Sequence, residues 1–467
     1  MVNKIITTYA SKIENYSRLE PRFYLYQSLL KNLFDKFGYE EINDFATLKS
    51  GSTPEHYENK KNIEDYYFVK SADIKRYNLN FSTISFVSRE THESRLKFKI
   101  VPNDILLSNT GSVGFACVVP QVLKESSTSQ NLIRIRFKDK NLVKFNPYFL
   151  VAFLNSQVGQ MEIESLLTST NQKYLNMENF RKYKAPKKID EKIMEKVSLK
   201  MQSGEDKETN SLSLLEQAKV FFYKKLRIDF SKIKKENFYS VNIANFLEAD
   251  LWTPKYSYPL YINTLKTIQK QWKTVPLGEI ATVKKGDEVG SENYNLYLEK
   301  KKTDIPFIRT SDLVNHEADQ FPDFFISQEI YNELDQNIKP GDVLFTKDGK
   351  IGMTAMITKN DRVIISSGVA RLRLKNEAKK YSLTPEYLFL VLSLKETGLY
   401  PSIRRTVIAS TLPHLREERL KEFEIPILDK NSIDEITKLV KKAFELKDEK
   451  KKLIQKAQRE IDNYFQV

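Results

Sequence analysis

Three polar side chains in the second half of the chain have the types found in metal-dependent nucleases. Asp342 and Asp348 could hold Mg²⁺, and Lys350 could lie beside an attacking water molecule. Their spacing is very short for such a site, and an equivalent stretch that begins at Asp104 lacks both the second carboxylate and the lysine. We therefore interpret Asp104 and Asp342 as turn-capping residues that precede a strand. A magnesium-dependent nuclease remains an alternative of lower rank.

Other sequence patterns typical of enzymes are missing. Neither a G-x-x-x-x-G-K-[ST] loop nor a G-x-G-x-x-G turn occurs. His56, His92, His316 and His414 lack the spacing of a zinc site, and we expect each to lie at the surface. The stretch "NPYF" at 146–149 is similar to the loop with which adenine methyltransferases hold their target amino group, but its second proline is missing. We therefore expect no catalysis by this chain.

An internal duplication organises the elements that must position these residues. The stretch "IVPNDILLSNTGSVGFACVV" at 100–119 recurs as "IKPGDVLFTKDGKIGMTAMI" at 338–357. Further segments recur in the same order about 235 to 240 positions later, namely 42–51 with 277–286, 68–74 with 307–313, 146–156 with 384–394, and 180–186 with 420–426. The entry to each copy has a looser match, 18–24 with 246–252. Such self-similarity predicts two domains of one fold.

Each copy is predicted to form an α+β globule. Its apolar runs break at Gly111 and Gly114, where the backbone must turn tightly, and the second copy keeps both glycines. After a further strand, a helix is predicted to begin at Pro147 with Asn146 as its N-cap, and likewise in the second copy. The lone cysteine, Cys117, lies in an apolar run and is interpreted as buried filler.

A long helix is predicted after each globule. Residues 433–464 carry apolar side chains at alternating steps of three and four, interrupted only at Lys447 and Lys450. Residues 194–222 repeat the pattern, with the polar interruption "SGEDKETN" in the same middle region. Because both helices share one register, we predict that they pair as an antiparallel coiled coil, which gives a pseudo-twofold internal repeat.

Composition and charge restrict the class of protein. The chain has 467 residues, of which 40% are hydrophobic and 29% charged, and no stretch approaches the roughly 20 apolar residues of a membrane span. Its beginning has no apolar run typical of a secretion signal, so we expect a cytoplasmic protein. The formal net charge of +14 favours nucleic acid over a lipid surface. A coiled-coil assembly protein with incidental charge is an alternative from another class.

The ordered repeat resembles the specificity (S) subunit of type I restriction-modification systems over nearly the whole chain. The blocks "PNDILLSNTGSVG" and "PGDVLFTKDGKIG" resemble the family's "GD-I/V-L...G..G" block, and the first departs from it at Asn103. Ile425 and Pro426 match the strand that closes each domain in the family, and 185–186 match it less well. The resemblance implies two target-recognition domains of mixed α and β structure and no chemistry in this chain.

The resemblance also implies the domain boundaries and the partners. An N-terminal segment (1–14) would precede recognition domain 1 (15–186), a central conserved helical region (187–235), recognition domain 2 (236–427) and a C-terminal conserved helix (428–467). Partners would be double-stranded DNA, two modification (methyltransferase) subunits and restriction (motor and nuclease) subunits, with no membrane. S-adenosylmethionine, ATP and Mg²⁺ would belong to those subunits, so this chain would carry no cofactor. A specificity subunit of another methyltransferase-linked system, type IIB-like or for phage defence, is the neighbouring alternative.

In this interpretation each recognition domain reads one half of a bipartite target, while the helices set the spacing and dock the methyltransferase subunits. Loop residues that differ between the copies would contact base edges or phosphate. In the first domain the predicted DNA-binding residues are Lys49, Lys70, Ser71, Arg76, Asn109, Thr110, Ser169, Asn171, Gln172 and Lys173. In the second they are Lys284, Lys285, Arg309, Ser311, Lys347, Lys350, Arg404, Arg405 and Thr406.

Overall fold

The chain forms two compact units. The computed structural model describes residues 21–58, 65–138, 145–168, 173–247, 249–287, 305–409 and 412–465. Unit 1 comprises Met1–Asp206 and Lys452–Val467, and unit 2 comprises Lys207–Lys451. Three of the predicted DNA-binding residues, Ser169, Asn171 and Gln172, lie outside the described residues. In the described part of the chain, every helix is too short or too polar to cross a membrane.

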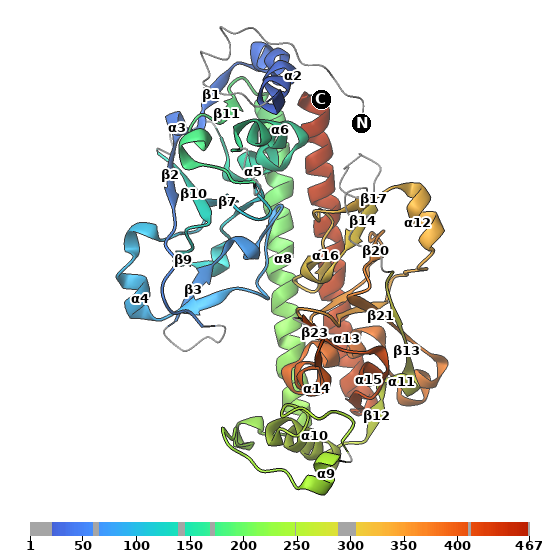
Figure 1. Ribbon diagram of the computed structural model, residues 1–467. Helices are drawn as coiled ribbons and strands as arrows, with labels where there is room; N and C mark the ends of the chain where they lie inside the picture. The colour runs from blue at the N-terminus through green and yellow to red at the C-terminus, as the bar shows by residue number, and fades with distance from the viewer. Residues whose placement is uncertain are drawn as a thin grey trace. The chain divides into compact units, whose positions relative to one another are not determined.

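Unit 1 is built on a four-stranded antiparallel sheet in the order β2-β10-β7-β8 (Figure 1). Its strands are β2 (Ala46–Ser50), β7 (Ile105–Ser108), β8 (Ala116–Val118) and β10 (Leu132–Phe137). A second sheet, in the order β6-β3-β9, contains β3 (Tyr66–Val69), β6 (Ser85–Val87) and β9 (Ser127–Thr128). Two short pairs complete the strands: β1 (Tyr39–Glu41) with β11 (Lys184–Pro186), and β4 (Ile74–Lys75) with β5 (Asn78–Leu79).

Unit 2 repeats this topology strand for strand. Its main sheet, β13-β21-β18-β19, contains β13 (Ala281–Lys285), β18 (Val343–Thr346), β19 (Thr354–Met356) and β21 (Val369–Leu374). The second sheet, β17-β14-β20, contains β14 (Ile305–Ile308), β17 (Phe325–Ile326) and β20 (Ile364–Ile365). The short pairs are β12 (Thr274–Pro276) with β24 (Glu424–Pro426), and β15 (Leu313–Val314) with β16 (Glu317–Ala318). The predicted duplication of one α+β fold is thereby confirmed.

Unit 2 also contains the hairpin β22 (Val407–Ala409) and β23 (Leu412–His414). At the corresponding place in unit 1, the described residues form a single bridge between Thr168 and Tyr174.

Helices cover the sheets in the same order in both units. The longer ones are α2 (Pro21–Phe37), α5 (Pro147–Asn155) and α6 (Gln157–Leu166) in unit 1, and α10 (Pro259–Gln271) and α13 (Pro385–Ser393) in unit 2. The six-residue helix α14 (Tyr400–Arg405) follows α13. Short helices are α3 (Ile42–Phe45), α4 (Arg89–Glu93), α7 (Met177–Phe180), α9 (Ile243–Leu247), α11 (Leu277–Ile280), α12 (Gln328–Leu334) and α15 (Glu417–Lys421).

Local sequence explains where these helices begin. Asn146 Oδ1 accepts the Tyr148 N–H at 2.9 Å, and Thr384 Oγ1 accepts the Tyr387 N–H at 3.1 Å, which confirms the predicted N-caps. The predicted match of 18–24 with 246–252 is wrong. Helices α2 and α10 each precede the first strand of their unit, so Pro21 corresponds to Pro259, and the stretch 227–258 comes between α8 and α10.

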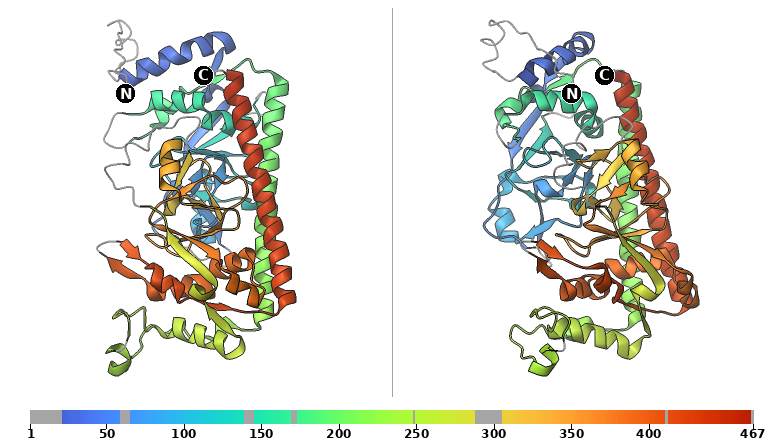
Figure 2. Two further views of the ribbon diagram at one scale, coloured as in Figure 1. Left: turned by 90° about the vertical axis from the view of Figure 1, so that its right-hand side faces the viewer. Right: turned by 45° about the vertical axis from the view of Figure 1, so that its right-hand side comes forward.

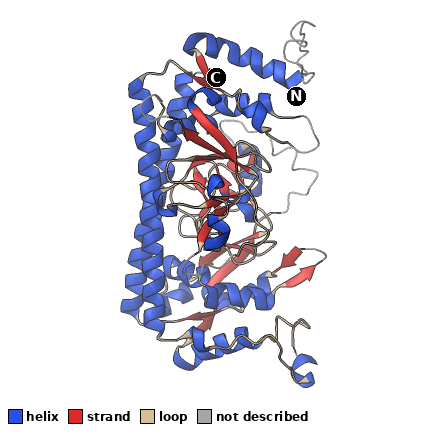
Figure 3. Ribbon diagram, turned by 90° about the vertical axis from the view of Figure 1, so that its left-hand side faces the viewer, coloured by secondary structure: helices blue, strands red, loops and turns tan. Residues whose placement is uncertain are grey.

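The two long helices are α8 (Glu191–Leu226) and α16 (Lys430–Phe465), of 36 residues each. Figure 2 shows α8 in green beside α16 in red, and Figure 3 shows each as one continuous helix. Within unit 1, Lys200 Nζ lies 3.0 Å from Glu460 Oε2, and within unit 2 Lys207 pairs with Glu449. Residue numbers rise along one helix as they fall along the other, which confirms the antiparallel pairing. The predicted seam is buried in both, as at Val197 and Ile436.

Matched ion pairs hold the central strands of each unit. Asp104, 2% exposed, accepts both N–H groups of the Arg136 fork at 2.7 Å, and Asp342, 1% exposed, accepts those of Arg373 at 2.6 and 2.7 Å. Each aspartate also accepts the backbone N–H three residues before it, at 2.9 and 2.8 Å. Their predicted role as turn-capping residues is confirmed.

The repeated turns need special backbone geometry. Gly111, Gly114, Gly349 and Gly352 all have φ between 64° and 90°, as the predicted tight turns require. The departure at Asn103 fits the same requirement, because its φ is 70° and asparagine tolerates this left-handed region.

Candidate nucleic-acid interface

Strand direction gathers loops of unit 2 at one end of its sheets. β13 ends at Lys285 and β18 at Thr346, and both ends lie beside the start of β21. β14 and β20 are parallel, so both end near Ile308. We call the loops at this end the loop edge of unit 2, which comprises residues 284–287, 309–311, 347–350, 366–368 and 412–415.

Backbone hydrogen bonds tie the loop edge of unit 2 together. Lys347 donates its N–H to Gly368 O at 2.9 Å and accepts the Leu415 N–H at 2.8 Å. Gly349 donates to Pro413 O at 3.0 Å, which connects the turn after β18 to the hairpin. The Ser366 N–H donates to Ile308 O at 2.9 Å, so segments from five places in the sequence share one surface.

Unit 1 has an equivalent loop edge, formed by residues 49–52, 70–71, 109–110, 129–131 and 173–175. Asn109 donates its N–H to Asn131 O at 3.3 Å and accepts the Leu175 N–H at 3.1 Å, as Lys347 does in unit 2. The Ser129 N–H donates to Val69 O at 2.9 Å. The same backbone frame therefore carries different side chains in the two units.

The charged side chains of the unit 2 loop edge are mostly basic. Lys284, Lys285, Ser311 and Lys350 are exposed. Buried Lys347 lies 3.3 Å from Asp348 and 3.5 Å from Glu417, and Asp348 also bonds the His414 ring.

Arg309, on the same edge, is held by two carboxylates. Its guanidinium lies 3.0 Å from both Asp312 and Asp323 and stacks over Phe324 at 4.1 Å. Burial would lower the pKa of Arg309, but these two carboxylates raise it. Arg309 and Lys347 are therefore fixed by neighbours, and the lysines at 284, 285 and 350 are exposed.

The unit 1 loop edge carries fewer charges. Lys49 and Lys173 are exposed, and Ser71 and Thr110 are half-buried. Lys70 donates to Ser85 Oγ at 2.6 Å. The side chain of Asn109 is buried, and its Oδ1 atom has no hydrogen-bond partner among the residues that the structure describes.

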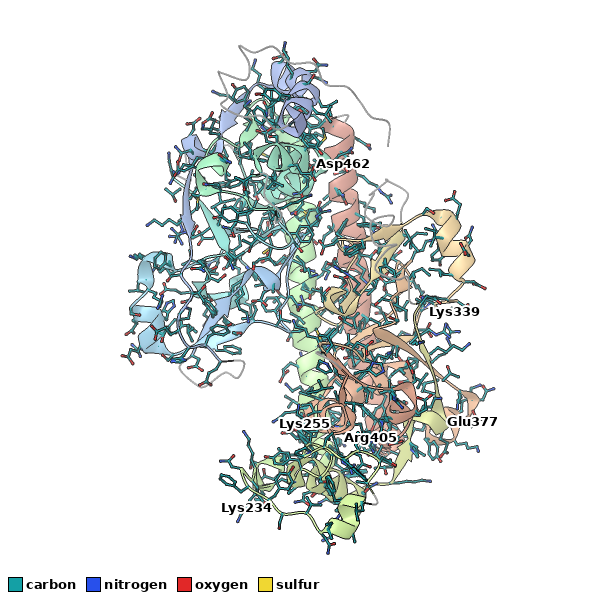
Figure 4. The ribbon with its side chains drawn as sticks, viewed as in Figure 1. Lys234, Lys255, Lys339, Glu377, Arg405 and Asp462 are labelled. Atoms are coloured by element: carbon teal, nitrogen blue, oxygen red, sulfur yellow. The ribbon has the colours of Figure 1, made fainter. Side chains whose placement is uncertain are left out.

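Four predicted DNA-binding residues make structural contacts away from the loop edges. Arg76 packs over the Phe115 ring at 4.5 Å, and Arg404 over the Tyr256 ring at 4.5 Å. Arg405, labelled in Figure 4, is buried and lies 3.0 Å from Glu422. The Thr406 hydroxyl donates to Ser402 O at 2.7 Å. These contacts fasten α14 and the turn after β4 to their surroundings.

The sequence interpretation missed two exposed residues of the unit 1 loop edge, Gln130 and Asn131. The polar run "SSTSQN" immediately before a predicted strand was the available signal. Tyr174 and His414 were missed as well, because nothing local connects them with the turns at 109–110 and 347–350.

The nuclease constellation is not assembled. Asp342 precedes β18 and Asp348 follows it, so the two carboxylates lie about 15 to 20 Å apart at the rise of an extended strand. Within the described ranges, no group of three or more His, Cys, Asp or Glu side chains could hold a metal ion.

The predicted surface position is wrong for His92, which is 1% exposed, and for His316, whose ring packs edge-on against Phe389 and lies 3.2 Å from Thr354 O. The His92 ring stacks on Tyr66 at 3.9 Å and lies within hydrogen-bond distance of Ser127 and Glu125. Cys117 is buried, as predicted.

Comparison with known proteins places the chain in a family. Its sequence matches the type I restriction modification DNA specificity domain twice, over residues 35–198 and 269–458. Solved structures with a detectable likeness include the S subunit of a type I restriction-modification system from M. genitalium, at 16% identity and a TM-score of 0.36, over 91% of this chain and 94% of that one.

Another is the HsdS subunit from Thermoanaerobacter tengcongensis, at 16% identity and a TM-score of 0.28, over 91% and 96% of the two chains. Because the family match is duplicated and covers most of the sequence, this chain belongs to the family of type I restriction-modification DNA specificity domains and carries two of them.

Proposed function

We propose that the chain is the DNA-specificity subunit of a type I restriction-modification complex and that each unit reads one half of a bipartite target. The observation that carries this proposal is the pair of loop edges, in which one hydrogen-bonded frame holds different side chains. Two different half-sites require different contacts, and a shared backbone frame that carries different exposed side chains meets this requirement.

The predicted domain organisation is part of this proposal. Recognition domains at 15–186 and 236–427 would alternate with conserved helical regions at 187–235 and 428–467. Each 36-residue helix is about 54 Å long at 1.5 Å per residue, which exceeds one turn of B-DNA at about 34 to 36 Å. The helices are therefore long enough to serve as a spacer between readers of neighbouring grooves.

Different residues of the loop edges would have different tasks. The exposed lysines are suited to phosphate, which positions the protein on DNA without reading sequence: Lys49, Lys173, Lys284, Lys285 and Lys350. Amide, hydroxyl and imidazole groups at the edges are suited to base contacts: Thr110, Gln130, Asn131, Ser311 and His414. Arg309, Lys70 and Lys347 would support these loops through the contacts described above.

The chain itself would not be catalytic. Methyltransferase subunits carrying S-adenosylmethionine would dock on the paired helices, and restriction subunits carrying ATP and Mg²⁺ would join them in the cytoplasm. The outward side of α8 offers exposed apolar side chains for such docking at Leu199 and Val220, which are 58% and 57% exposed.

Co-expression with the methyltransferase subunit of the same restriction-modification system tests the proposal. Single-molecule sequencing of the host DNA should show methylation at one bipartite motif, and methylation by the isolated chain would contradict a non-catalytic role. Asn131→Ala should relax the sequence preference at a position in one half of the motif and leave the other half unchanged, because Asn131 belongs to unit 1 alone.

A matched pair of lysine variants tests the phosphate contacts. Lys350→Ala should weaken binding to all sequences alike and reduce the salt slope by about 1, because one counterion fewer is released. Lys380→Ala is the control, because Lys380 lies in the helical turn after the end of β21, whereas the loop edge lies beside the start of β21. Lys339 and Glu377, labelled in Figure 4, mark the end of the sheet opposite the loop edge. Equal losses in both variants would contradict the assignment of the loop edge.

A further inference from the structure

A cluster of six charged side chains is buried in unit 2 where the apolar seam between α8 and α16 is interrupted. Each of the six side chains is at most 5% exposed. Three come from α16, one from α8, one from β16 and one from the segment before β20: Lys447, Lys450, Lys451, Glu208, Glu317 and Asp361. The three positive and three negative groups balance.

Short contacts connect all six groups. Lys447 Nζ lies 3.0 Å from Glu208 and 3.2 Å from Glu317, and Lys450 bonds both of these carboxylates. Lys451 Nζ lies 2.7 Å from Asp361 and 3.4 Å from Glu317. Burial opposes ionisation, but the opposite charges lower the pKa of Glu317 and raise that of Lys450, so both stay charged.

Glu208 and Lys447 occupy the same position in the two copies of the helix. Asp190 and Asp429 cap the helices, each accepting a backbone N–H of the first turn, and they lie 239 positions apart. The same interval separates Glu208 from Lys447, as well as seam residues such as Ala218 and Ala457. One repeated seam position therefore holds an acid in α8 and a base in α16.

In an antiparallel pair of repeated helices, counterpart residues face each other only at the middle of the pair. Away from the middle, the buried seam of both helices is mostly apolar, as at Leu215 in α8 and Val440 in α16. Two α8 helices from different molecules, or two α16 helices, would bury the same apolar seam. At the middle, however, such pairs would place Glu208 against Glu208, or Lys447 against Lys447, away from water.

We propose that the Glu208–Lys447 pair makes α8 select α16 and reject the α8 of a second copy of this chain. A buried charge that faces a like charge is strongly unfavourable, whereas a buried pair of opposite charges is tolerated when its other hydrogen bonds are made. Lys450 and Glu317 supply those bonds here. The charges thus decide which helix pairs with α8, because the apolar seam does not distinguish α16 from a second α8.

The pairing of α8 with α16 is independent of whether the loop edges read DNA. A simpler role for the cluster is that it only fastens β16 and the segment around Asp361 to α16. In that case the charges would contribute stability but would not choose the partner of each helix. The two roles differ in what happens when two copies of the chain are present.

The experiment mixes two full-length variants that carry different affinity tags. Glu208→Lys leaves the middle of the seam with an excess of positive charge, and Lys447→Glu leaves it with an excess of negative charge. Each variant alone should lose on the order of a hundredfold or more in its folding equilibrium constant, because one buried pair is broken. Refolded together from urea, the two should copurify as a mixed dimer, because their excess charges are complementary.

The matched controls are Glu208→Asp and Lys447→Arg, which keep the charges and should give no more mixed dimer than two tagged wild-type chains. The proposal is overturned if Glu208→Lys and Lys447→Glu, refolded together, also give no more mixed dimer than two tagged wild-type chains. This holds whether each variant folds alone or the two aggregate together.

A second variant provides an independent test. Glu208→Leu combined with Lys447→Leu removes the discrimination and should refold with at least a tenfold larger dimer fraction than wild type, measured by light scattering. An unchanged dimer fraction overturns the proposal.

Discussion

Replacement of Asp342 by asparagine separates a structural carboxylate from a metal ligand. The Asp342 side chain is 1% exposed and accepts two N–H groups of Arg373 and the Lys339 N–H. Asparagine keeps one acceptor oxygen but turns an NH₂ group toward the guanidinium. Asp342→Asn should therefore destabilise unit 2 even when EDTA is present.

The magnitude follows from the bonds that are lost. A hydrogen bond to a charged group contributes about 1.5 to 3 kcal/mol, and two are removed. The Arg373 side chain is 30% exposed and keeps its bond to Asn337 O at 2.7 Å, so water and this carbonyl recover part of the loss. We expect a cost of about 2 to 4 kcal/mol, or roughly 5 to 10 °C in Tm for a unit of this size.

Thermal unfolding followed by circular dichroism gives the size of the effect, and hydrogen–deuterium exchange locates it in unit 2. Asp104→Asn should have the same effect in unit 1, because Asp104 makes the same bidentate contact with Arg136. Asp348→Asn is the matched control and should cost less than about 1 kcal/mol, because its side chain is 30% exposed. Equal stability of wild type and Asp342→Asn, or an effect that disappears with EDTA, would refute this reasoning.

Three further predictions concern groups buried by the fold. Burial raises the pKa of Glu162 from 4.5 to about 7, so the folded chain binds this proton more tightly than the unfolded chain. The free energy of unfolding of unit 1 should therefore fall by about 3 kcal/mol as pH rises from 4.5 to above 7. Glu162→Gln should abolish this pH dependence in urea titrations. Burial lowers the pKa of His316 from 6.5 to about 4, so unit 2 should lose stability as pH falls between these values, and His316→Gln should remove that loss. Gly286→Ala would place a Cβ atom 2.1 Å from Ile365 O, so it should lower the free energy of unfolding in urea by about 2 to 3 kcal/mol or more. In the control Gly111→Ala, the new Cβ atom meets nothing within 4 Å. This variant should cost only about 1 kcal/mol, because of the φ of 71° at that position.

Much of the fold could be predicted because its signals are local and occur twice. Asn146 before Pro147, and Thr384 before Pro385, define helix starts through capping geometry that involves only neighbouring residues. The alternating steps of the seam depend on the helical period alone, so the pairing of α8 with α16 also followed from the sequence.

The candidate site was predicted only in part, because it depends on contacts between distant segments. Residues near 49, 70, 109, 130 and 173 form one edge only because the strands that precede or follow them end together, and local composition does not specify this. The same limit explains Arg405, whose burial against Glu422 depends on where α14 packs.

By itself, the sequence determined the duplication, the strand–turn–strand and the capped helix of each unit and the register of the long helices, because these follow from short-range periodicity and capping. Only the tertiary structure decided which loops meet, that Asp342 and Asp348 lie at opposite ends of one strand, and that the lysines interrupting the seam are buried. Glu317 and Asp361, which neutralise those lysines, are more than 80 positions away along the chain. A charge becomes a buried partner or a solvated group through folding, and its neighbours in sequence do not decide which.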